Sequence, residues 1–182
     1  NVSVDIPTGV LTVITGVAGS GKSSLINQCF LSQHPDAIVI DQSPVGISSR
    51  SNPATYTGIM DEIRKTFAKV NKVSASLFSF NSKGACENCQ GLGVVYTELA
   101  FMDEVKLPCD ICNGKRFKDE VLAYAFHGQS ISEVLNMPVR EALAFFDTKE
   151  VAKDVVRKLQ ALSDVGLDYL TLGQPMSTLS GG

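Results

Sequence analysis

The sequence predicts an α/β fold in which a strand–loop–helix core is interrupted by a mostly helical subdomain with a metal module. Near the N-terminus, the β-branched run of residues 10–15 leads into a glycine-rich loop and then into a helical segment that begins at Lys22. Much later, two Cys-x-x-Cys pairs lie between segments whose apolar residues recur at helical spacing. An α/β core followed by a long, mostly helical insertion accounts for this order of strand, loop, helix and cysteine pairs.

Composition and charge limit the classes of protein that fit the chain. Its 182 residues suit one ordinary domain, or one domain with a small inserted module. A hydrophobic content of 44% with 19% charged residues is typical of a soluble protein with a core. No apolar run is long enough to span a membrane, and residues 1–9 lack the basic leader of a signal peptide. We expect a cytoplasmic protein, and the net charge of −3 argues against wholesale coating of nucleic acid.

The glycine-rich loop has the spacing Gly-x-x-x-x-Gly-Lys-Ser, which is that of a phosphate-binding P-loop. Its glycines allow backbone N–H groups to turn inward around phosphates at a helix N-terminus, where the dipole favours anions. Lys22 is expected to reach the β- and γ-phosphates as a catalytic residue, and Ser23 to bind Mg²⁺. The predicted nucleotide-binding residues here are Gly16, Val17, Ala18, Gly19, Ser20, Gly21, Lys22, Ser23 and Ser24. The loop predicts ATP and Mg²⁺ as cofactors.

A second short apolar run, residues 37–40, ends in Asp41 and Gln42. In ABC-type ATPases a glutamine at this place senses the metal and the attacking water, which makes Gln42 a candidate catalytic and nucleotide-binding residue. Two alternatives stay open. Asp41 could be a Walker B metal ligand, and Gln42 could be an ordinary loop residue beside Pro44.

The rest of the chain is expected to alternate loops and helices. Residues 43–57 are rich in Ser, Pro and Gly and predict a loop, whereas residues 59–70 have the apolar spacing of an amphipathic helix. The later patterns predict a ribbon over residues 94–101, a strand over 121–126, a short helix opened by a capping box at Ser130, and helices over 139–146 and 151–162, the last closed by Gly166.

The cysteines Cys86, Cys89, Cys109 and Cys112 form two knuckles separated by 19 residues. Four thiolates at this spacing predict a closed, tetrahedral zinc site that is structural, because no position is left for water. The alternative is four reduced cysteines in a core. Such a module could contact DNA through nearby basic residues, or it could simply hold the subdomain rigid. The basic residues near the ligands are Lys106, Lys115, Arg116 and Lys118. Cys29, by contrast, is expected to lie in a helix core.

Residues 63–85 form a basic strip that abuts the first cysteine pair. The strip has no acidic residue, and its basic side chains are Arg64, Lys65, Lys69, Lys72 and Lys83. Such a concentration of positive charge, interleaved with phenylalanines, suits phosphate binding. The alternative interpretation is a solvated helix face with phenylalanines in the core.

The last residues, Thr178-Leu179-Ser180-Gly181-Gly182, resemble the phosphate-capping signature loop of ABC-type ATPases. Ser180, Gly181 and Gly182 are therefore further candidate nucleotide-binding residues. Taken with the P-loop, this motif predicts an ABC-type ATPase core with an inserted, mostly helical signature subdomain that carries the four-cysteine zinc module.

Longer stretches resemble the UvrA family, the damage-recognition ATPases of bacterial nucleotide excision repair. The matching stretches are the P-loop, Asp41-Gln42-Ser43-Pro44, residues 51–58, Phe78-Ser79-Phe80-Asn81, the cysteine module with Gly114-Lys115-Arg116, and residues 165–182. The resemblance spans nearly the whole chain and is to the C-terminal half of the family's proteins. It implies an ATP-binding part at residues 1–45, a signature subdomain at 46–179 with its zinc module at about 84–117, and the start of the signature loop at 180–182.

The resemblance implies a homodimeric, DNA-binding ATPase of the excision nuclease system and the SOS response, which binds damaged duplex DNA and loads a partner helicase, UvrB. In the family, each ATP lies between the P-loop of one ABC half and the signature loop of the other half. The lysine before the zinc module contacts the DNA backbone, and here it is Lys83; Arg64, Lys115 and Arg116 are further candidate contacts. The family usually reads Lys-Gly-Gly-Arg-Cys where this chain has Lys83-Gly84-Ala85-Cys86. This departure leaves a UvrA-like drug-resistance paralogue as an alternative.

Two other classes compete with this interpretation. A nucleotide kinase with a four-cysteine zinc lid would explain Lys22, Ser23 and the cysteines, but not the terminal signature motif. A DnaJ-type co-chaperone shares the spacing Cys-x-x-Cys-x-Gly-x-Gly, but it repeats that motif four times and lacks a P-loop. No Walker B aspartate–glutamate pair follows the signature motif, so we expect the 182-residue chain to bind nucleotide without hydrolysing it.

Overall fold

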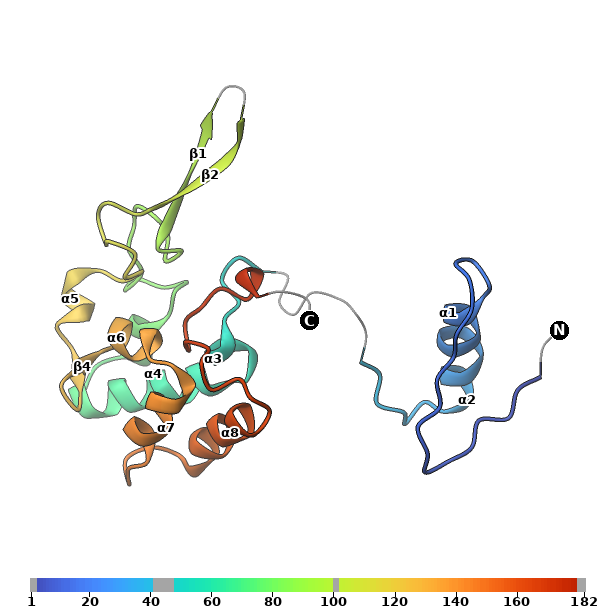
Figure 1. The fold of residues 1–182 in the computed structure, drawn as a ribbon. Helices are drawn as coiled ribbons and strands as arrows, with labels where there is room; N and C mark the ends of the chain where they lie inside the picture. Colours follow the sequence, from blue (N-terminus) through green and yellow to red (C-terminus); the bar gives the residue numbers. More distant parts are fainter. Residues whose placement is uncertain (1–2, 41–47, 100–101, 180–182) are drawn as a thin grey trace. The chain divides into compact units, whose positions relative to one another are not determined.

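The computed structural model describes residues 3–40, 48–99 and 102–179. The chain divides into two compact units, which are residues 1–42 and residues 43–182 (Figure 1). Among the described residues, no helix is long and apolar enough to cross a membrane.

The first unit consists of an extended segment, the glycine-rich loop and a helix. The helix starts as α1 (Lys22–Ser24), widens into the π-helical η1 (Leu25–Phe30) and ends as α2 (Leu31–Gln33). This confirms the helix predicted after the loop. Cys29 is exposed on it, so the predicted core position of that cysteine is wrong.

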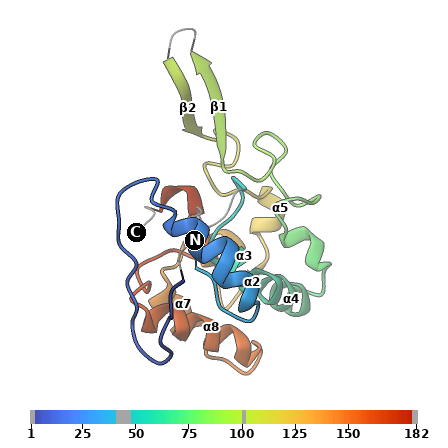
Figure 2. The same ribbon diagram turned by 90° about the vertical axis from the view of Figure 1, so that its right-hand side faces the viewer.

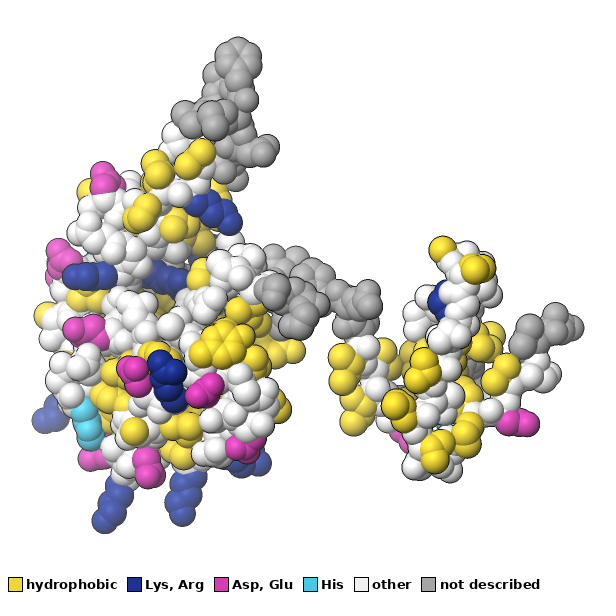
Figure 3. Space-filling model, in the orientation of Figure 1, with side chains coloured by type: hydrophobic (Ala, Val, Ile, Leu, Met, Phe, Trp, Pro, Cys, Tyr) yellow, Lys and Arg dark blue, Asp and Glu magenta, His cyan; other side chains and the backbone are white. Residues whose placement is uncertain are grey.

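The strand predicted over residues 10–15 does not form, and the apolar run before Asp41 is not a strand either. Leu11 and Ile38 are each 93% exposed, and Figure 3 shows many apolar side chains on the surface of this unit. A β-strand is defined by hydrogen bonds to a neighbouring strand, and no described residue pairs with either run. Both runs have the β-branched composition of buried strands, although neither pairs with another segment of the part of the chain that the structure describes.

In the residues that the structure describes, the second unit is a helical body with two antiparallel hairpins. Its elements are α3 (Pro53–Tyr56), α4 (Ile59–Asn71), η2 (Ala75–Phe78), β1 (Val94–Leu99), β2 (Met102–Pro108), α5 (Asp119–Leu122), β3 (Ala125–Phe126), β4 (Gln129–Ser130), α6 (Ile131–Asn136), α7 (Val139–Phe146), α8 (Lys153–Asp164) and η3 (Met176–Thr178). Strand β1 pairs with β2 and β3 with β4. Figures 1 and 2 show the β1–β2 hairpin projecting away from the helices, at the end where the cysteine module lies.

Aromatic side chains form the centre of the helical body. Helix α4 buries one face, including Ile59, Ile63 and Phe67. The Phe67 ring lies 5.2 Å from Phe78 and 6.0 Å from Phe126, measured between ring centroids. These contacts hold α4 against η2 and β3. The buried apolar residues whose helical spacing predicted α4 therefore form the face that packs against η2 and β3.

Two local predictions for the second unit need correction. The loop predicted over residues 43–57 contains the short helix α3, because Asn52 and Thr55 form a reciprocal capping box and Pro53 is suited to a first turn. Of the strand predicted over residues 121–126, the first two residues are the end of helix α5 and only Ala125–Phe126 forms a strand. There Asp119 and Glu120 fall in a helical first turn, where acidic side chains are favourable.

The capping box predicted at Ser130 is confirmed. The Glu133 carboxylate accepts from the Ser130 hydroxyl at 2.6 Å and from the Ser130 N–H at 2.7 Å. The hydroxyl and then the backbone N–H lower the pKa of Glu133 from its ordinary value of 4.5. Because the folded-state pKa is depressed, this stabilisation is present above pH 4.5 and is lost as pH falls through the folded-state pKa.

Glu133→Gln should therefore destabilise the chain near neutral pH and have little effect in acid. The measurement is urea unfolding of both proteins at about pH 7 and about pH 3. Glu141→Gln, an exposed change in the first turn of α7, serves as the control. A difference for Glu133→Gln that stays constant across this pH range would contradict the assignment.

Candidate metal centre and nucleotide loop

The four cysteines of the second unit come together in a buried cluster. The Sγ atoms of Cys86, Cys89, Cys109 and Cys112 all lie within 4.8 Å of one another. The Cys86–Cys109 and Cys89–Cys112 sulfur pairs are 3.9 and 3.6 Å apart. Sulfurs at about 2.3 Å from a tetrahedral zinc ion lie about 3.8 Å from one another. The cluster therefore has the dimensions of a zinc site.

Tight turns after each cysteine pair create this geometry. Gln90 and Asn113 have φ angles of 49° and 48°, and the glycines that follow them, Gly91 and Gly114, have 78° and 80°. These left-handed conformations fold the chain back over the sulfurs. Added atoms at Gly91 would meet the Phe80 carbonyl oxygen at 2.3 Å, so a side chain does not fit there.

Hydrogen-bond donors point at the sulfurs. The Gly93 N–H lies 3.2 Å from the Cys89 sulfur, and the Asn88 amide lies 3.3 Å from the Cys109 sulfur. Donation from the Cys112 N–H is the main cause that lowers the pKa of Cys109 to about 6. Burial raises the pKa of Cys112 to about 12. Four clustered thiols with donors aimed at them suit a bound cation that would hold all four as thiolates.

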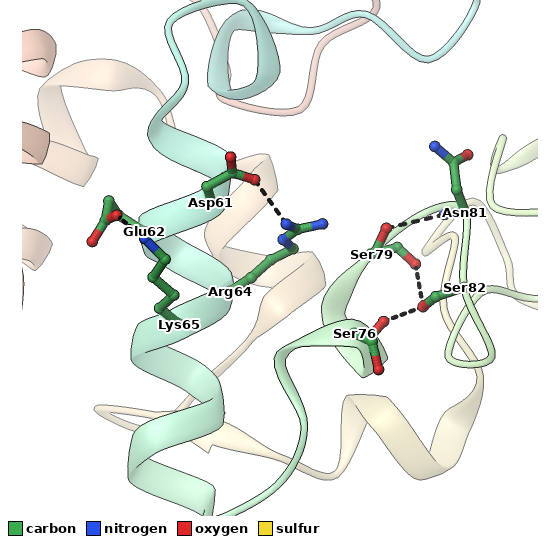
Figure 4. Close-up of polar contacts among 8 residues, drawn as sticks. All are labelled: Asp61, Glu62, Arg64, Lys65, Ser76, Ser79, Asn81 and Ser82. Atoms are coloured by element: carbon green, nitrogen blue, oxygen red, sulfur yellow. Dashed lines mark hydrogen bonds and ion pairs between the residues drawn. The ribbon is translucent and has the colours of Figure 1, made fainter.

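The predicted DNA contacts differ in their surroundings. Lys83 and Lys115 are exposed, and neither side chain makes a hydrogen bond or ion pair with the described residues. Arg64 is held by Asp61 at 2.8 Å, just as Lys65 is held by Glu62 one residue along α4 (Figure 4). The acidic residues immediately before the basic strip thus neutralise part of it.

Arg116 is not a free surface cation. Its guanidinium donates to the Gly173 carbonyl at 2.8 Å and lies 5.3 Å from the centre of the Phe80 ring. Burial lowers the pKa of this arginine. These contacts occupy the side chain within the protein, which argues against its predicted role as a DNA contact.

A groove of about 600 Å³ lies beside the cysteine cluster and is lined by Lys83, Arg50 and Lys118, among others. Lys118 pairs with Glu87, and this contact raises the pKa of the lysine and lowers that of the glutamate. Neither Lys83 nor Arg50 forms an ion pair with a described carboxylate in this groove, and Arg50 donates instead to the Gln90 backbone carbonyl, which leaves Lys83 without a bonded partner among the described residues.

Sequence reasoning missed Arg50, which donates from Nη2 to the Gln90 carbonyl at 2.8 Å. It falls in a stretch that predicts only a loop. No periodic pattern marks it, because its partner is a backbone oxygen 40 residues away.

The glycine-rich loop of the first unit curls around the ammonium group of Lys22. Lys22 Nζ donates to the carbonyls of Gly16 and Val17, each at 2.8 Å. Gly19 and Gly21 have φ angles of 78° and 87°, the latter directly before α1. The backbone therefore has the left-handed glycines that a phosphate-cradling loop requires. Asp41, Gln42, Ser180, Gly181 and Gly182 lie outside the described residues.

Known proteins resemble the chain along its whole length. UvrABC system protein A from Staphylococcus epidermidis is 45% identical and that from Bacillus subtilis 44% identical, both across 100% of this chain. The chain spans 22% of the length of these relatives. No protein-family profile matches it.

A solved structure agrees with the sequence matches. The crystal structure of UvrA2 from Deinococcus radiodurans matches 92% of this chain and 23% of that protein, with a TM-score of 0.79 and 40% identity. The resemblance inferred from the motifs is thereby confirmed, and neither the kinase nor the co-chaperone is favoured. The chain is a homologue of the UvrA family along its whole length.

Proposed function

We propose that the chain is part of a UvrA-like ABC ATPase that binds damaged duplex DNA in excision repair. Residues 1–45 would supply the P-loop and glutamine of the ATP-binding core, residues 46–179 the signature subdomain, and residues 180–182 the start of the signature loop. The observation that carries the proposal is the 44–45% identity to proteins named UvrABC system protein A across the whole chain.

The whole protein would act with further partners. The ATP sites would be completed by the other ABC half, so that the P-loop and the signature loop of this chain belong to two different sites. A homodimer of such proteins would load a UvrB-like helicase in the cytoplasm. The identity to UvrABC system proteins supports this reading over the drug-resistance paralogue that the missing arginine before Cys86 suggested.

The cysteine cluster would hold a structural zinc ion. Cys86, Cys89, Cys109 and Cys112 fit it by their spacing, their burial and the donors aimed at their sulfurs. Bound zinc would supply a cross-link between two loops and no reaction step, because four thiolates close its coordination.

The P-loop would bind ATP with Mg²⁺. Lys22 would exchange the carbonyls of Gly16 and Val17 for β- and γ-phosphate oxygens, and Ser23, exposed in the first turn of the helix, would ligate Mg²⁺. Gln42 would sense the metal-bound water.

Lys22→Ala should weaken ATP binding by about 10- to 100-fold, because a hydrogen bond to a charged group contributes about 1.5–3 kcal/mol. The measurement is titration of the 182-residue chain with a fluorescent ATP analogue and Mg²⁺. Asn27→Ala, an exposed change on the same helix, is the control. Equal affinities of Lys22→Ala and the unsubstituted chain would refute the P-loop assignment.

The groove beside the cysteine cluster would contact the DNA backbone. Lys83 is the leading candidate, with Lys115 exposed on the same module, whereas Arg64 and Arg116 are held by partners within the protein. Phosphate contacts release counterions, so each one adds to the salt dependence of binding.

Lys83→Ala should lower the slope of log affinity against log salt by about 0.9 on duplex DNA. The measurement is fluorescence anisotropy with a labelled duplex, with and without a bulky lesion, over a series of salt concentrations. Lys149→Ala, another exposed lysine of the second unit, is the control. A slope that is unchanged by Lys83→Ala would rule out this phosphate contact, and failure of the unsubstituted chain to bind duplex would overturn the DNA-binding proposal.

A further inference from the structure

Two arginines connect the cysteine module, residues 84–117, to the segments by which the chain enters and leaves the second unit. The entry segment is residues 48–54, and the exit segment is residues 170–179. We infer that Arg50 and Arg116 are positioning residues that transmit metal binding at the cysteine cluster to these two segments. This inference rests on the zinc site of the proposed function, and it adds a mechanical role for the module.

Arg116 joins the second knuckle to the exit segment. Its Nη2 donates to the Gly173 carbonyl at 2.8 Å across 57 residues of sequence. Two further contacts surround the side chain. The guanidinium lies over the Phe80 ring, and the stem lies so close to Gly93 that a Cβ added at that glycine would be 3.0 Å from Arg116 Cγ. Arg116 therefore contacts Gly93 within the module and Phe80 just before it, and it bonds Gly173 in the exit segment.

Arg50 joins the first knuckle to the entry segment. Its Nη2 donates to the carbonyl of Gln90, the residue that follows Cys89 and has a left-handed backbone. Because this carbonyl belongs to the turn that wraps the sulfurs, its position depends on the cluster.

The entry and exit segments are also hydrogen-bonded to each other. The Met176 N–H donates to the Ser51 carbonyl at 2.8 Å, and the Ala54 N–H donates to the Leu172 carbonyl at 3.0 Å. These hydrogen bonds form a continuous path. It goes from the first knuckle through Arg50 to the entry segment, across to the exit segment, and back through Arg116 to the second knuckle. A shift at the cluster therefore displaces both segments together.

Metal binding matters because both knuckles set the backbone of Arg116. The Cys86 N–H donates to the Arg116 carbonyl at 2.9 Å, and the preceding Lys115 N–H donates to the Cys112 carbonyl at 2.9 Å. Arg116 also has a φ of 71°, a conformation that a non-glycine residue keeps only when its surroundings hold it. A cation that ties the four sulfurs together would fix this conformation.

The test is hydrogen–deuterium exchange of the full 182-residue chain, prepared with a chelator and then with stoichiometric Zn²⁺. In the unsubstituted chain, zinc should slow exchange of amides in residues 51–54 and 172–176 by about tenfold, through suppression of local opening. Arg116→Gln keeps a long side chain, and glutamine is about as strained as arginine at the positive φ of this position. This variant should lose most of the zinc-dependent slowing. Arg50→Gln should lose it chiefly in residues 51–54. Arg140→Gln, an exposed arginine whose side chain makes no bond with the described residues, should retain it.

Zinc stoichiometry and the absorption spectrum of the Co²⁺-substituted cluster, measured on each variant, separate the possible outcomes. Arg116→Gln that binds zinc fully and shows the same zinc-dependent slowing as the unsubstituted chain would overturn the inference. If Arg116→Gln does not fold, Arg50→Gln alone decides, by the same criterion. An unsubstituted chain that binds no zinc would overturn the zinc site itself and the inference with it. Loss of DNA or nucleotide binding with intact zinc-dependent slowing would count against the proposed function alone.

Discussion

Cys109→Ser is expected to abolish stoichiometric zinc binding and to unfold the cysteine module. Cys109 is fully buried, and its sulfur is a member of the four-sulfur cluster. A serine hydroxyl stays protonated where a thiolate is needed, so the closed tetrahedral site loses a ligand. The binding free energy of structural zinc sites is folding free energy, about 10–16 kcal/mol in zinc-finger peptides. Loss of one ligand therefore removes much of the free energy that holds the two knuckles together.

The measurements are zinc release detected with a colorimetric chelator, and thermal unfolding followed by circular dichroism. The β1–β2 hairpin should lose its strand signal, because the Cys109 N–H that donates to the Gly93 carbonyl marks where the hairpin joins the knuckles. Cys29→Ser is the matched control, since this cysteine is exposed and belongs to the first unit. One zinc per chain and an unchanged melting temperature in Cys109→Ser would show that the cluster is not a metal site.

Features that depend on local periodicity or spacing could be predicted from the sequence. Helix α4 follows from apolar residues that face one side, and α6 from a serine and a glutamate three positions apart. The cysteine cluster follows from the spacing of its two pairs, because the geometry of a knuckle is set within a few residues.

Features that depend on distant partners could not be predicted. The exposed run of residues 10–15 has the composition of a buried strand, yet pairing depends on a neighbour that its own sequence does not specify. Arg116 illustrates the same limit. Its charge and its place after a cysteine pair suggested DNA, but its partners, Phe80 and Gly173, lie far away in sequence and occupy it within the protein.

The helix α3 was missed for a different reason. Asn52 and Thr55 form its capping box, and these residue types are also common in loops. The same composition therefore supports both interpretations, and the reciprocal hydrogen bonds that decide between them appear only in the structure.

Phe67→Ala is expected to destabilise the second unit by about 3–5 kcal/mol, the range for truncating a buried phenylalanine. The ring has no exposed surface and lies between Phe78 of η2 and Phe126 of β3. Its removal leaves a cavity among rings that cannot all move inward, since each is anchored on a different element. Urea unfolding monitored by far-ultraviolet circular dichroism measures the loss.

The same change should also loosen the backbone that presents Lys83. Leu77 of η2 lies so close to Gly84 that a Cβ added to Gly84 would be 1.9 Å from the Leu77 carbonyl oxygen. The packing of η2 on α4 therefore fixes the position of Gly84, the residue next to Lys83. Val70→Ala, on the same helix but 46% exposed, should change stability by no more than about 0.5 kcal/mol. Equal stabilities of Phe67→Ala and Val70→Ala would mean that the aromatic cluster does not hold α4.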